Sequence, residues 1–159
     1  MAPDYIIKFH NHSDVALNRV ECFYPTFSTG PARPVTIPTD HLHANGGLET
    51  LGWEVILQDL ASGPYDGAVA WRHPTTNHLF GVQIHVPVQI FHIGTSPYYQ
   101  VRHDNGDGSS NYYTPVEEAG KAWDFPEDWS KASGLKVRVD PVAGGQKLEV
   151  NVTISKYKA

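Results

Sequence analysis

Apolar and polar residues alternate along this chain in short runs. Most apolar stretches are about four to eight residues long and rich in Val, Ile, Tyr and Phe, which is typical of strands in a small β-protein. Turn signals such as Gly30-Pro31, Asn45-Gly46-Gly47 and Asn105-Gly106 separate the runs. The pattern predicts strands at residues 4–10, 15–23, 35–38, 52–57, 67–72, 79–86, 98–103, 135–140 and 148–156.

Helical signals are scarce. The best candidate begins with Thr114 as N-cap and Pro115 at the first helical position, and Glu117 is placed to hydrogen-bond back to the cap. Gly120 and Pro126 limit this helix to about two or three turns, and residues 126–129 are expected to add one more. Many short strands with little helix and no βα alternation predict an all-β antiparallel sandwich with one or two short helices.

Composition narrows the functional classes. At 159 residues and 17.6 kDa, with 40% hydrophobic residues, the chain fits one domain spanning residues 1–159. A net charge of −5 with only 12 Lys and Arg and no basic run argues against a nucleic-acid partner, and against docking on anionic lipid through charge alone. The single cysteine, Cys22, excludes an internal disulfide and is expected to behave as a small buried hydrophobe.

No signal for membrane insertion or Sec-dependent export is visible. No stretch approaches the roughly 20 apolar residues of a spanning helix, and the start lacks a basic region followed by a long apolar one. We therefore expect a soluble protein that is cytoplasmic or exported by a non-classical route. Any association with a target membrane would be peripheral.

Histidine is frequent, with nine residues, and two pairs invite a metal interpretation. His10/His12 and His41/His43 are spaced so that both rings of a pair lie on one face of a strand. A closed zinc or copper site needs three or four ligands, and no Cys or carboxylate accompanies either pair at a recognisable spacing. We expect solvent-facing histidines near turns, and no metal or other cofactor.

Catalytic motifs are equally weak. The Asp104-Asn105-Gly106-Asp107-Gly108 run lacks the regular ligands of a calcium loop and predicts a tight turn. No G-x-S-x-G elbow occurs, and Cys22 lies inside a predicted strand. We expect no catalytic residue and no enzyme, with a His-dependent metalloenzyme or hydrolase kept as an alternative.

The tyrosines are the most informative feature. Two doublets, Tyr98-Tyr99 and Tyr112-Tyr113, flank the region after a predicted buried strand. Adjacent side chains on a strand point to opposite faces, so one of Tyr98 and Tyr99 should enter the core and the other should face outward. Because tyrosine combines a flat apolar ring with a polar tip, clustered tyrosines suit head groups, sugars and membrane interfaces. Trp123 and Phe125 are instead expected to anchor a helix to the core.

Several segments resemble the actinoporin family. Residues 67–103 are similar to its central strands and the aromatic loop between them, and residues 5–30 and 148–153 are similar to its early and last strands. The last strand is equally similar to fungal fruit-body lectins, as is Ala44-Asn45-Gly46-Gly47, and the fungal aegerolysins share a related sandwich. The resemblance implies a β-sandwich with a head-group or sugar pocket at one end.

Carried over by position, the resemblance implies a set of contact residues. The phosphocholine pocket would involve Ser28, His85 in place of the family's serine, Val86, Pro87, Tyr98, Tyr112 and Tyr113. The loop that contacts membrane in the family would offer Ile90, Phe91 and His92 here, without the family's tryptophans.

The resemblance implies the membrane-binding function of the family without its pore-forming segment. Actinoporins carry an amphipathic pore-forming segment before the first strand, and only Met1–Asp4 precede Tyr5 in this sequence. We therefore expect a non-enzymatic, cytolysin-related toxin or defence protein that binds a phosphocholine- or sphingomyelin-like head group without that segment. It would act alone, as a homo-oligomer or with a separate pore-forming partner. A glycan-binding lectin of the fruit-body type is the alternative, and a structural role through an exposed sheet edge also remains open.

Overall fold

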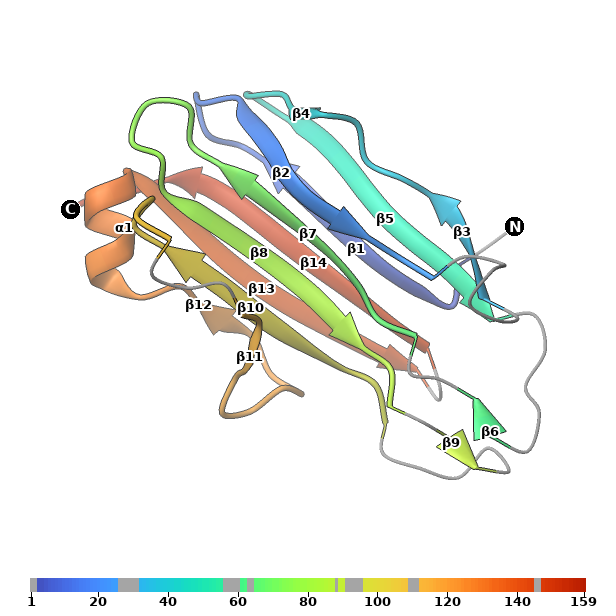
Figure 1. Ribbon diagram of the computed structural model, residues 1–159. Helices are drawn as coiled ribbons and strands as arrows, with labels where there is room; N and C mark the ends of the chain where they lie inside the picture. The colour runs from blue at the N-terminus through green and yellow to red at the C-terminus, as the bar shows by residue number, and fades with distance from the viewer. Residues whose placement is uncertain are drawn as a thin grey trace.

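The computed structural model describes residues 3–25, 32–55, 61–62, 65–87, 89–90, 96–108, 112–144 and 147–159. Nearly all of its regular structure is β-strand (Figure 1). The strands are β1 (Tyr5–Asn11), β2 (Leu17–Phe23), β3 (Ala32–Thr36), β4 (His41–Leu42), β5 (Gly47–Val55), β6 (Ala61–Ser62), β7 (Gly67–Arg72), β8 (Leu79–His85), β9 (Gln89–Ile90), β10 (Tyr98–Asp104), β11 (Thr114–Pro115), β12 (Trp123–Asp124), β13 (Leu135–Gly144) and β14 (Lys147–Lys156). The helix in these ranges is α1 (Glu127–Ser133).

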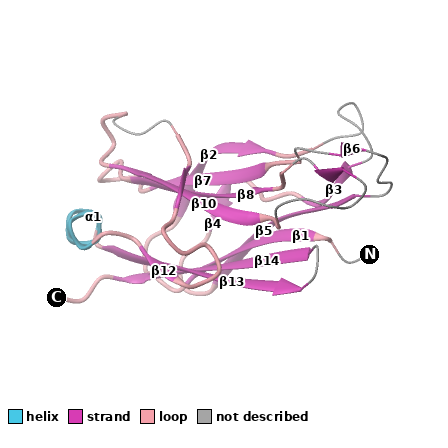
Figure 2. Cartoon of the chain, turned by 90° about the horizontal axis from the view of Figure 1, so that it is seen from below, coloured by secondary structure: helices cyan, strands magenta, loops and turns pink. Residues whose placement is uncertain are grey.

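Two six-stranded sheets pack face to face (Figure 2). The back sheet has the order β12-β13-β14-β1-β5-β3, and the front sheet has the order β11-β10-β8-β7-β2-β4. A separate two-stranded pair, β6 and β9, projects beyond one end of the sandwich (Figure 1). The predicted all-β sandwich with a short helix is therefore confirmed.

The core lies between the sheets and follows the alternation read from the sequence. The largest side chains that are fully buried there are Trp53, Trp71, Tyr99, Phe9 and Phe80. β1 and β14 bury every second residue, as expected for strands with one face on the core. Each predicted strand overlaps an observed one, and the strands that the pattern missed are only two residues long.

One strand pair departs from the antiparallel expectation. β1 pairs with β14 in parallel, from Tyr5 opposite Leu148 to Asn11 opposite Ile154. The other strand pairs described are antiparallel. Since parallel neighbours need a crossover connection, only strands distant in sequence can form this pair, and here they are the first and last strands described.

The helix predicted from Thr114 is wrong. Thr114 and Pro115 form β11, which pairs with Val101 and Gln100 of β10 at the front sheet's edge. Pro115 is tolerated at such an edge because its missing N–H faces away from the sheet. The cap signals were purely local, whereas pairing with β10 and burial of Val116 are tertiary gains that outweigh a helix of two or three turns.

The observed helix is the turn expected at 126–129, extended to Ser133. Pro126 occupies the N-cap position without a side-chain hydrogen bond, and Glu127 and Asp128 place acidic groups in the first turn. Gly134 ends the helix at φ 76°, a left-handed conformation that glycine adopts without strain. α1 covers one end of the sandwich, where Trp129 packs on Phe80 and Phe125. Trp123 and Phe125 do not anchor the predicted helix, which does not form, but Phe125 is buried against Trp129 of α1, and Trp123 is only partly buried.

The outer face of the front sheet has a floor of small residues. Ala70 of β7 and Gly81 of β8 are register partners, and Glu21 of β2 and Arg102 of β10 are their outer neighbours. A bulge at Val20 shifts the register of β2, so that Glu21 and Phe23 face outward. Among the described residues, no helix has the length and apolar character needed to cross a bilayer.

Candidate functional site

Of the described residues in the predicted site, His85 and Tyr98 belong to the front sheet, and Tyr112 and Tyr113 directly precede its edge strand β11. His85 ends β8 and Tyr98 begins β10, and the two residues are register partners at the end of the sheet from which β6 and β9 project. Val86 and Pro87 follow at this same end. Ile90 belongs to β9, whose backbone alone is described, while Ser28, Phe91 and His92 lie outside the described residues.

At this end, His85 is held by its neighbours. Its Nδ1 atom lies 2.9 Å from Asp66 Oδ1, and the Val86 amide donates to the same carboxylate oxygen at 3.0 Å. The imidazole stands against the Tyr98 ring, with 5.1 Å between centroids. His85 and Asp66 each keep about a quarter of the side chain exposed, at 28% and 26%. An imidazole, a carboxylate and a phenol are therefore gathered in a partly exposed cluster.

Tyr113 is occupied by the fold itself. Its hydroxyl donates to Glu21 Oε1 at 2.6 Å, and Arg102 Nη1 approaches the same oxygen at 3.5 Å. The phenol lies over the small floor, since a Cβ added to Gly81 would meet its hydroxyl oxygen at 2.8 Å and the Ala70 Cβ at 2.9 Å. Burial, followed by the hydrogen bond to Glu21, raises the pKa of Tyr113 far above its ordinary value. Tyr113 therefore fixes its segment to the outer face of the front sheet, and we call this contact with Glu21 and Gly81 the Tyr113 latch.

The four phenols therefore do different things. Tyr99 is buried and its hydroxyl donates to the Lys121 carbonyl at 2.8 Å, which confirms that the first doublet splits between core and surface. Tyr112 is 77% exposed. Tyr98 precedes Arg102 by four residues on β10, about 13 Å at strand spacing, so it lies at a distance from the Tyr113 latch. Tyr98 and Tyr113 do not form one cage.

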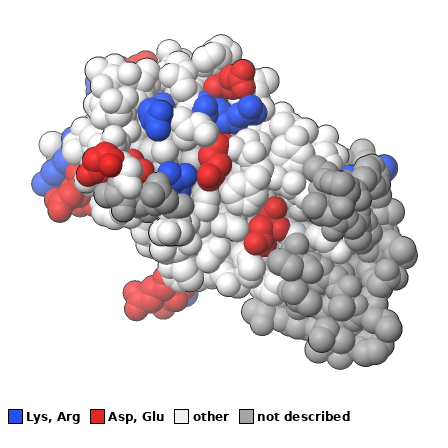
Figure 3. Space-filling model, in the orientation of Figure 1, with Lys and Arg blue, Asp and Glu red and all other residues white. Residues whose placement is uncertain are grey.

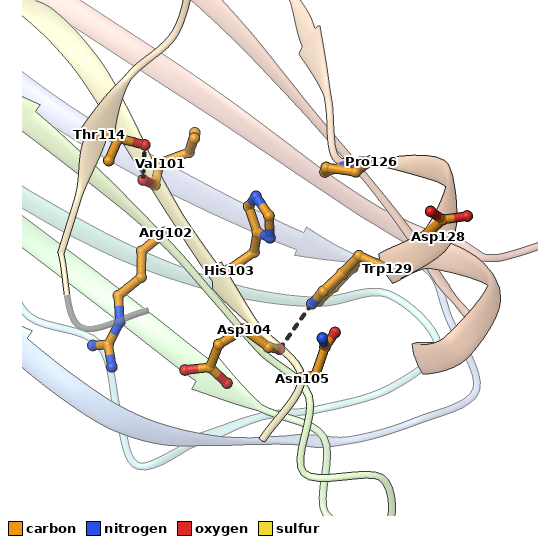
Figure 4. A pocket seen from close by; sticks show the side chains of 9 residues that line it. All are labelled: Val101, Arg102, His103, Asp104, Asn105, Thr114, Pro126, Asp128 and Trp129. Carbon is orange, nitrogen blue, oxygen red and sulfur yellow. Dashed lines mark hydrogen bonds between the residues drawn. The ribbon is translucent and has the colours of Figure 1, made fainter. Parts of the chain in front are cut away.

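A pocket opens at the other end of β10, beside α1 (Figure 4). Its volume is about 360 Å³, within the range of small-ligand sites. Figure 4 shows His103, Asn105, Trp129, Pro126 and Thr114 around the hollow, while the side chains of Arg102 and Asp104 point away from it. The remaining lining residues are Val101 and Asp128.

This pocket exists because β10 is only partly covered along its edge. β11 pairs with Gln100 and Val101 alone, so the next residues of β10 meet α1 instead of a strand. Trp129 Nε1 donates to the Asp104 carbonyl at 3.1 Å and ties the helix to that strand end. The Asp104 carboxylate in turn accepts from the Gly106 amide at 2.8 Å, which forms the predicted tight turn.

The pocket's groups are suited to hydrogen bonding, with neutral groups beside the carboxylate of Asp128. Burial lowers the pKa of His103 below its usual value, against a weaker opposing effect of Asp104. Its imidazole is therefore neutral at pH 7, with one donor and one acceptor nitrogen. Asp128 and Asn105 are exposed at the rim, and the Trp129 ring forms a buried apolar wall. The set offers acceptors, donors and flat rings together.

Two further observations concern the charge on the surface and the side chains that could bind a metal ion. Figure 3 shows acidic and basic side chains lying near one another over the front face. The rings of His10 and His12 stack side by side at 6.4 Å, as their spacing predicted. Across the part of the chain that the structure describes, no group of three His, Cys, Asp or Glu side chains is placed to hold a metal ion.

No protein-family model matches the chain, and no curated protein matches it. The resemblance to actinoporins and fruit-body lectins therefore stays a prediction from short motifs.

Sequence reasoning missed the β10–α1 pocket. His103 lies at the end of a predicted strand, and Asp128 and Trp129 lie in the predicted turn at 126–129, about 25 residues further on. Each segment was identified separately, but no local pattern indicated that the two meet. The one available signal for this pocket was the start of a helix, with apolar and polar residues together, after a strand at the edge of the sheet.

Proposed function

We propose that this chain is a non-enzymatic recognition module that binds a glycan in the pocket between β10 and α1. The observation that carries the proposal is the pocket itself: about 360 Å³, with an aromatic wall and neutral or acidic hydrogen-bonding groups around it. Sugars present hydroxyls along their edges and C–H groups on their faces, so they need planar polar side chains together with a ring.

The individual residues match that requirement. Asp128 accepts hydrogen bonds from adjacent sugar hydroxyls, and Asn105 both donates and accepts. His103, neutral because burial lowers its pKa, also does both. Trp129 is 3% exposed and is fixed by its bond to the Asp104 carbonyl, so it forms a rigid apolar part of the pocket lining.

A glycan array followed by calorimetry tests this function. Asp128→Ala removes an exposed carboxylate at the rim, and Lys131→Ala is the matched control, since it changes an exposed residue of the same helix outside the pocket. A hydrogen bond to a charged group contributes about 1.5–3 kcal/mol, so Asp128→Ala should weaken binding roughly 10- to 100-fold. Lys131→Ala should leave the dissociation constant within about two-fold.

The competing outcomes are distinct. Free sugar should compete with the immobilised glycan, and phosphocholine should not. Equal affinity of the Asp128→Ala variant and the wild type would place the site elsewhere. A blank array with purified, folded protein would reject the glycan function.

A second candidate, recognition of a zwitterionic lipid head group, is favoured by the cluster of His85, Asp66 and Tyr98. The Asp66 carboxylate and the Tyr98 ring suit a choline ammonium through charge and cation–π attraction, and His85 offers a hydrogen bond to the phosphate. We rank it second because the described tyrosines do not surround a common point. Homo-oligomerisation or recruitment of a pore-forming partner would belong to this function.

Vesicle sedimentation tests the second candidate. Tyr98→Ala should reduce pelleting with sphingomyelin-containing vesicles by roughly three- to ten-fold, given about 0.5–2 kcal/mol for a cation–π contact. Tyr112→Ala, a change at a more exposed phenol, measures whether the second doublet contributes. Competition by phosphocholine and not by sugar would favour this function over the first.

A further inference from the structure

A second open groove lies on the opposite side of the molecule and has a different character. It runs over the outer face of the back sheet at the end next to α1, with a volume of about 420 Å³. Its lining consists of His12, Lys136, Ser155, Lys156 and Lys158. A chain with a net charge of −5 thus gathers three lysines in one hollow.

Strand register explains why two of these side chains, Lys136 and Ser155, lie together. Lys136 of β13 is directly opposite Ser155 of β14, so both side chains point to the same outer face. The His12 amide donates to the Ile154 carbonyl at 2.7 Å, which brings the end of β1 alongside. Lys156 ends β14, and Lys158 follows it. The arrangement rests on well-paired backbone at the meeting point of three strands.

Two of the three ammonium groups are not neutralised. Within the described ranges, no carboxylate lies within ion-pair distance of Lys136 or Lys158, and Lys156 reaches Asp14 only at 3.9 Å. Lys136 and Lys158 also line an adjacent pocket that contains the acids Asp124 and Glu127. Asp124 pairs with Arg138 at 3.1 Å, whereas Glu127 accepts from the Tyr157 hydroxyl, a neutral donor that does not cancel the charge of a carboxylate. The three lysines still outnumber Asp14 and Glu127. The groove therefore keeps a local excess of positive charge.

We propose that this groove binds a phosphate monoester group, carried either by a small soluble molecule or by a lipid. Convergent ammonium groups suit a compact dianion, because each lysine acts as a point charge with several donors. The Ser155 hydroxyl and the His12 ring add neutral donors or acceptors. A choline phosphodiester is a poor fit, since its ammonium would be repelled by the three lysines. The site is independent of the glycan pocket.

The test uses the full chain and two forms of the ligand. Glycerol 3-phosphate is titrated in low-salt buffer while backbone amide shifts are followed by NMR, and vesicles that contain phosphatidic acid in phosphatidylcholine are compared with pure phosphatidylcholine vesicles. The groove variant is Lys136→Gln with Lys158→Gln. The control, Lys121→Gln with Lys131→Gln, makes the same change in net charge at exposed lysines outside the groove.

We expect saturable shifts centred on His12 and Ser155 with the soluble phosphate, vesicle binding that requires phosphatidic acid, or both, which identifies the source of the phosphate. The groove variant should raise the dissociation constant at least roughly ten-fold, and the control less than about two-fold. Equal weakening by both variants would mean bulk electrostatics and would overturn the site. Neither saturable shifts nor lipid-dependent pelleting would overturn it as well. Unchanged melting temperatures establish that the variants are folded.

Discussion

The cluster of Glu21, Arg102 and Tyr113 on the front sheet and the lysine groove on the back sheet treat their cations in opposite ways. On the front sheet, Arg102 is 11% exposed, extends toward Glu21 and shares that carboxylate with the Tyr113 hydroxyl. On the back sheet, Lys136 and Lys158 border an open groove and have no ion-pair partner among the described residues. The front cluster neutralises its cation internally, whereas the groove leaves its lysines exposed to solvent, although other back-sheet cations such as Arg138 are paired.

The difference separates structural charge from charge that is available to a ligand. A buried cation is retained only with its partner in place, because an unpaired charge out of water is costly. An exposed lysine needs no partner for stability and contributes little to folding. Tyr113, which the sequence placed in a ligand site, belongs to the first kind, whereas the lysines that the sequence left aside belong to the second.

The strongest way to break the comparison is to remove the front carboxylate. Glu21→Ala leaves the largely buried Arg102 and the Tyr113 hydroxyl without their shared acceptor. We expect a loss of about 2–3 kcal/mol in the free energy of unfolding. Thermal melting should show a decrease of roughly 5–10 °C. A melting temperature within about 1–2 °C of the wild-type value would contradict the structural role of this cluster.

Substitution of Gly81, which lies beneath Tyr113, should give the next largest loss in the free energy of unfolding. A Cβ at position 81 would lie 2.8 Å from the Tyr113 hydroxyl oxygen and 2.9 Å from the Ala70 Cβ, so Gly81→Ala should displace the phenol. The expected cost is about 1–2 kcal/mol by overpacking. Denaturant unfolding measures it, and Gly120→Ala is the control because a Cβ there has nothing within 4 Å. Equal effects of the two substitutions would count against the latch.

Lowering the pH should destabilise the folded chain through its buried imidazoles. Burial lowers the pKa of His103 and of His73, in the latter case with a contribution from His78. The unfolded chain therefore binds protons at higher pH than the folded chain, so stability is kept above the ordinary histidine pKa of about 6.5 and is lost as the pH falls below it.

Unfolding measured between pH 7.5 and 5 tests this expectation. His73→Asn should flatten the decline, because it removes one of the imidazoles whose pKa is lowered by burial. A profile that is flat over this range in the wild type would contradict the effect of burial on these imidazoles.

The smallest effect is expected on the back face. Lys136→Ala removes an exposed side chain with no ion pair among the described residues, so the free energy of unfolding should change by less than about 0.5 kcal/mol. Chemical denaturation beside the Glu21→Ala variant makes the comparison direct. A loss as large as that of Glu21→Ala would show that the lysine groove is structural.

The strand content was predictable because it is written in local alternation. β1, β7, β8 and β14 were located almost to the residue, since each buries every second side chain or lies fully between its neighbours. The helix at Thr114 failed for the converse reason. Its capping residues were correct locally, but β10 offered Thr114 and Pro115 a strand partner that the local sequence does not reveal.

The candidate sites were harder to predict than the strands. The resemblance to actinoporins predicted His85 and Tyr98 in one ligand site, and the structure places their rings in contact. It also grouped Tyr112 and Tyr113 with them, although Tyr113 is bound to Glu21, which is 92 residues earlier in the chain. Contacts at that separation depend on the order of strands in the sheet and leave no periodic trace.

The local pattern of the sequence was enough to predict a β-sandwich with a core of alternating apolar residues, because burial of one face of a strand imposes a period of two. It also predicted a helical turn near position 127. Only the tertiary structure decided that the first and last strands pair in parallel, that Tyr113 is latched on Gly81, and that Lys136, Lys156 and Lys158 share one groove. These features arise from the side-by-side arrangement of strands that are distant in sequence, which the local pattern of residues does not encode.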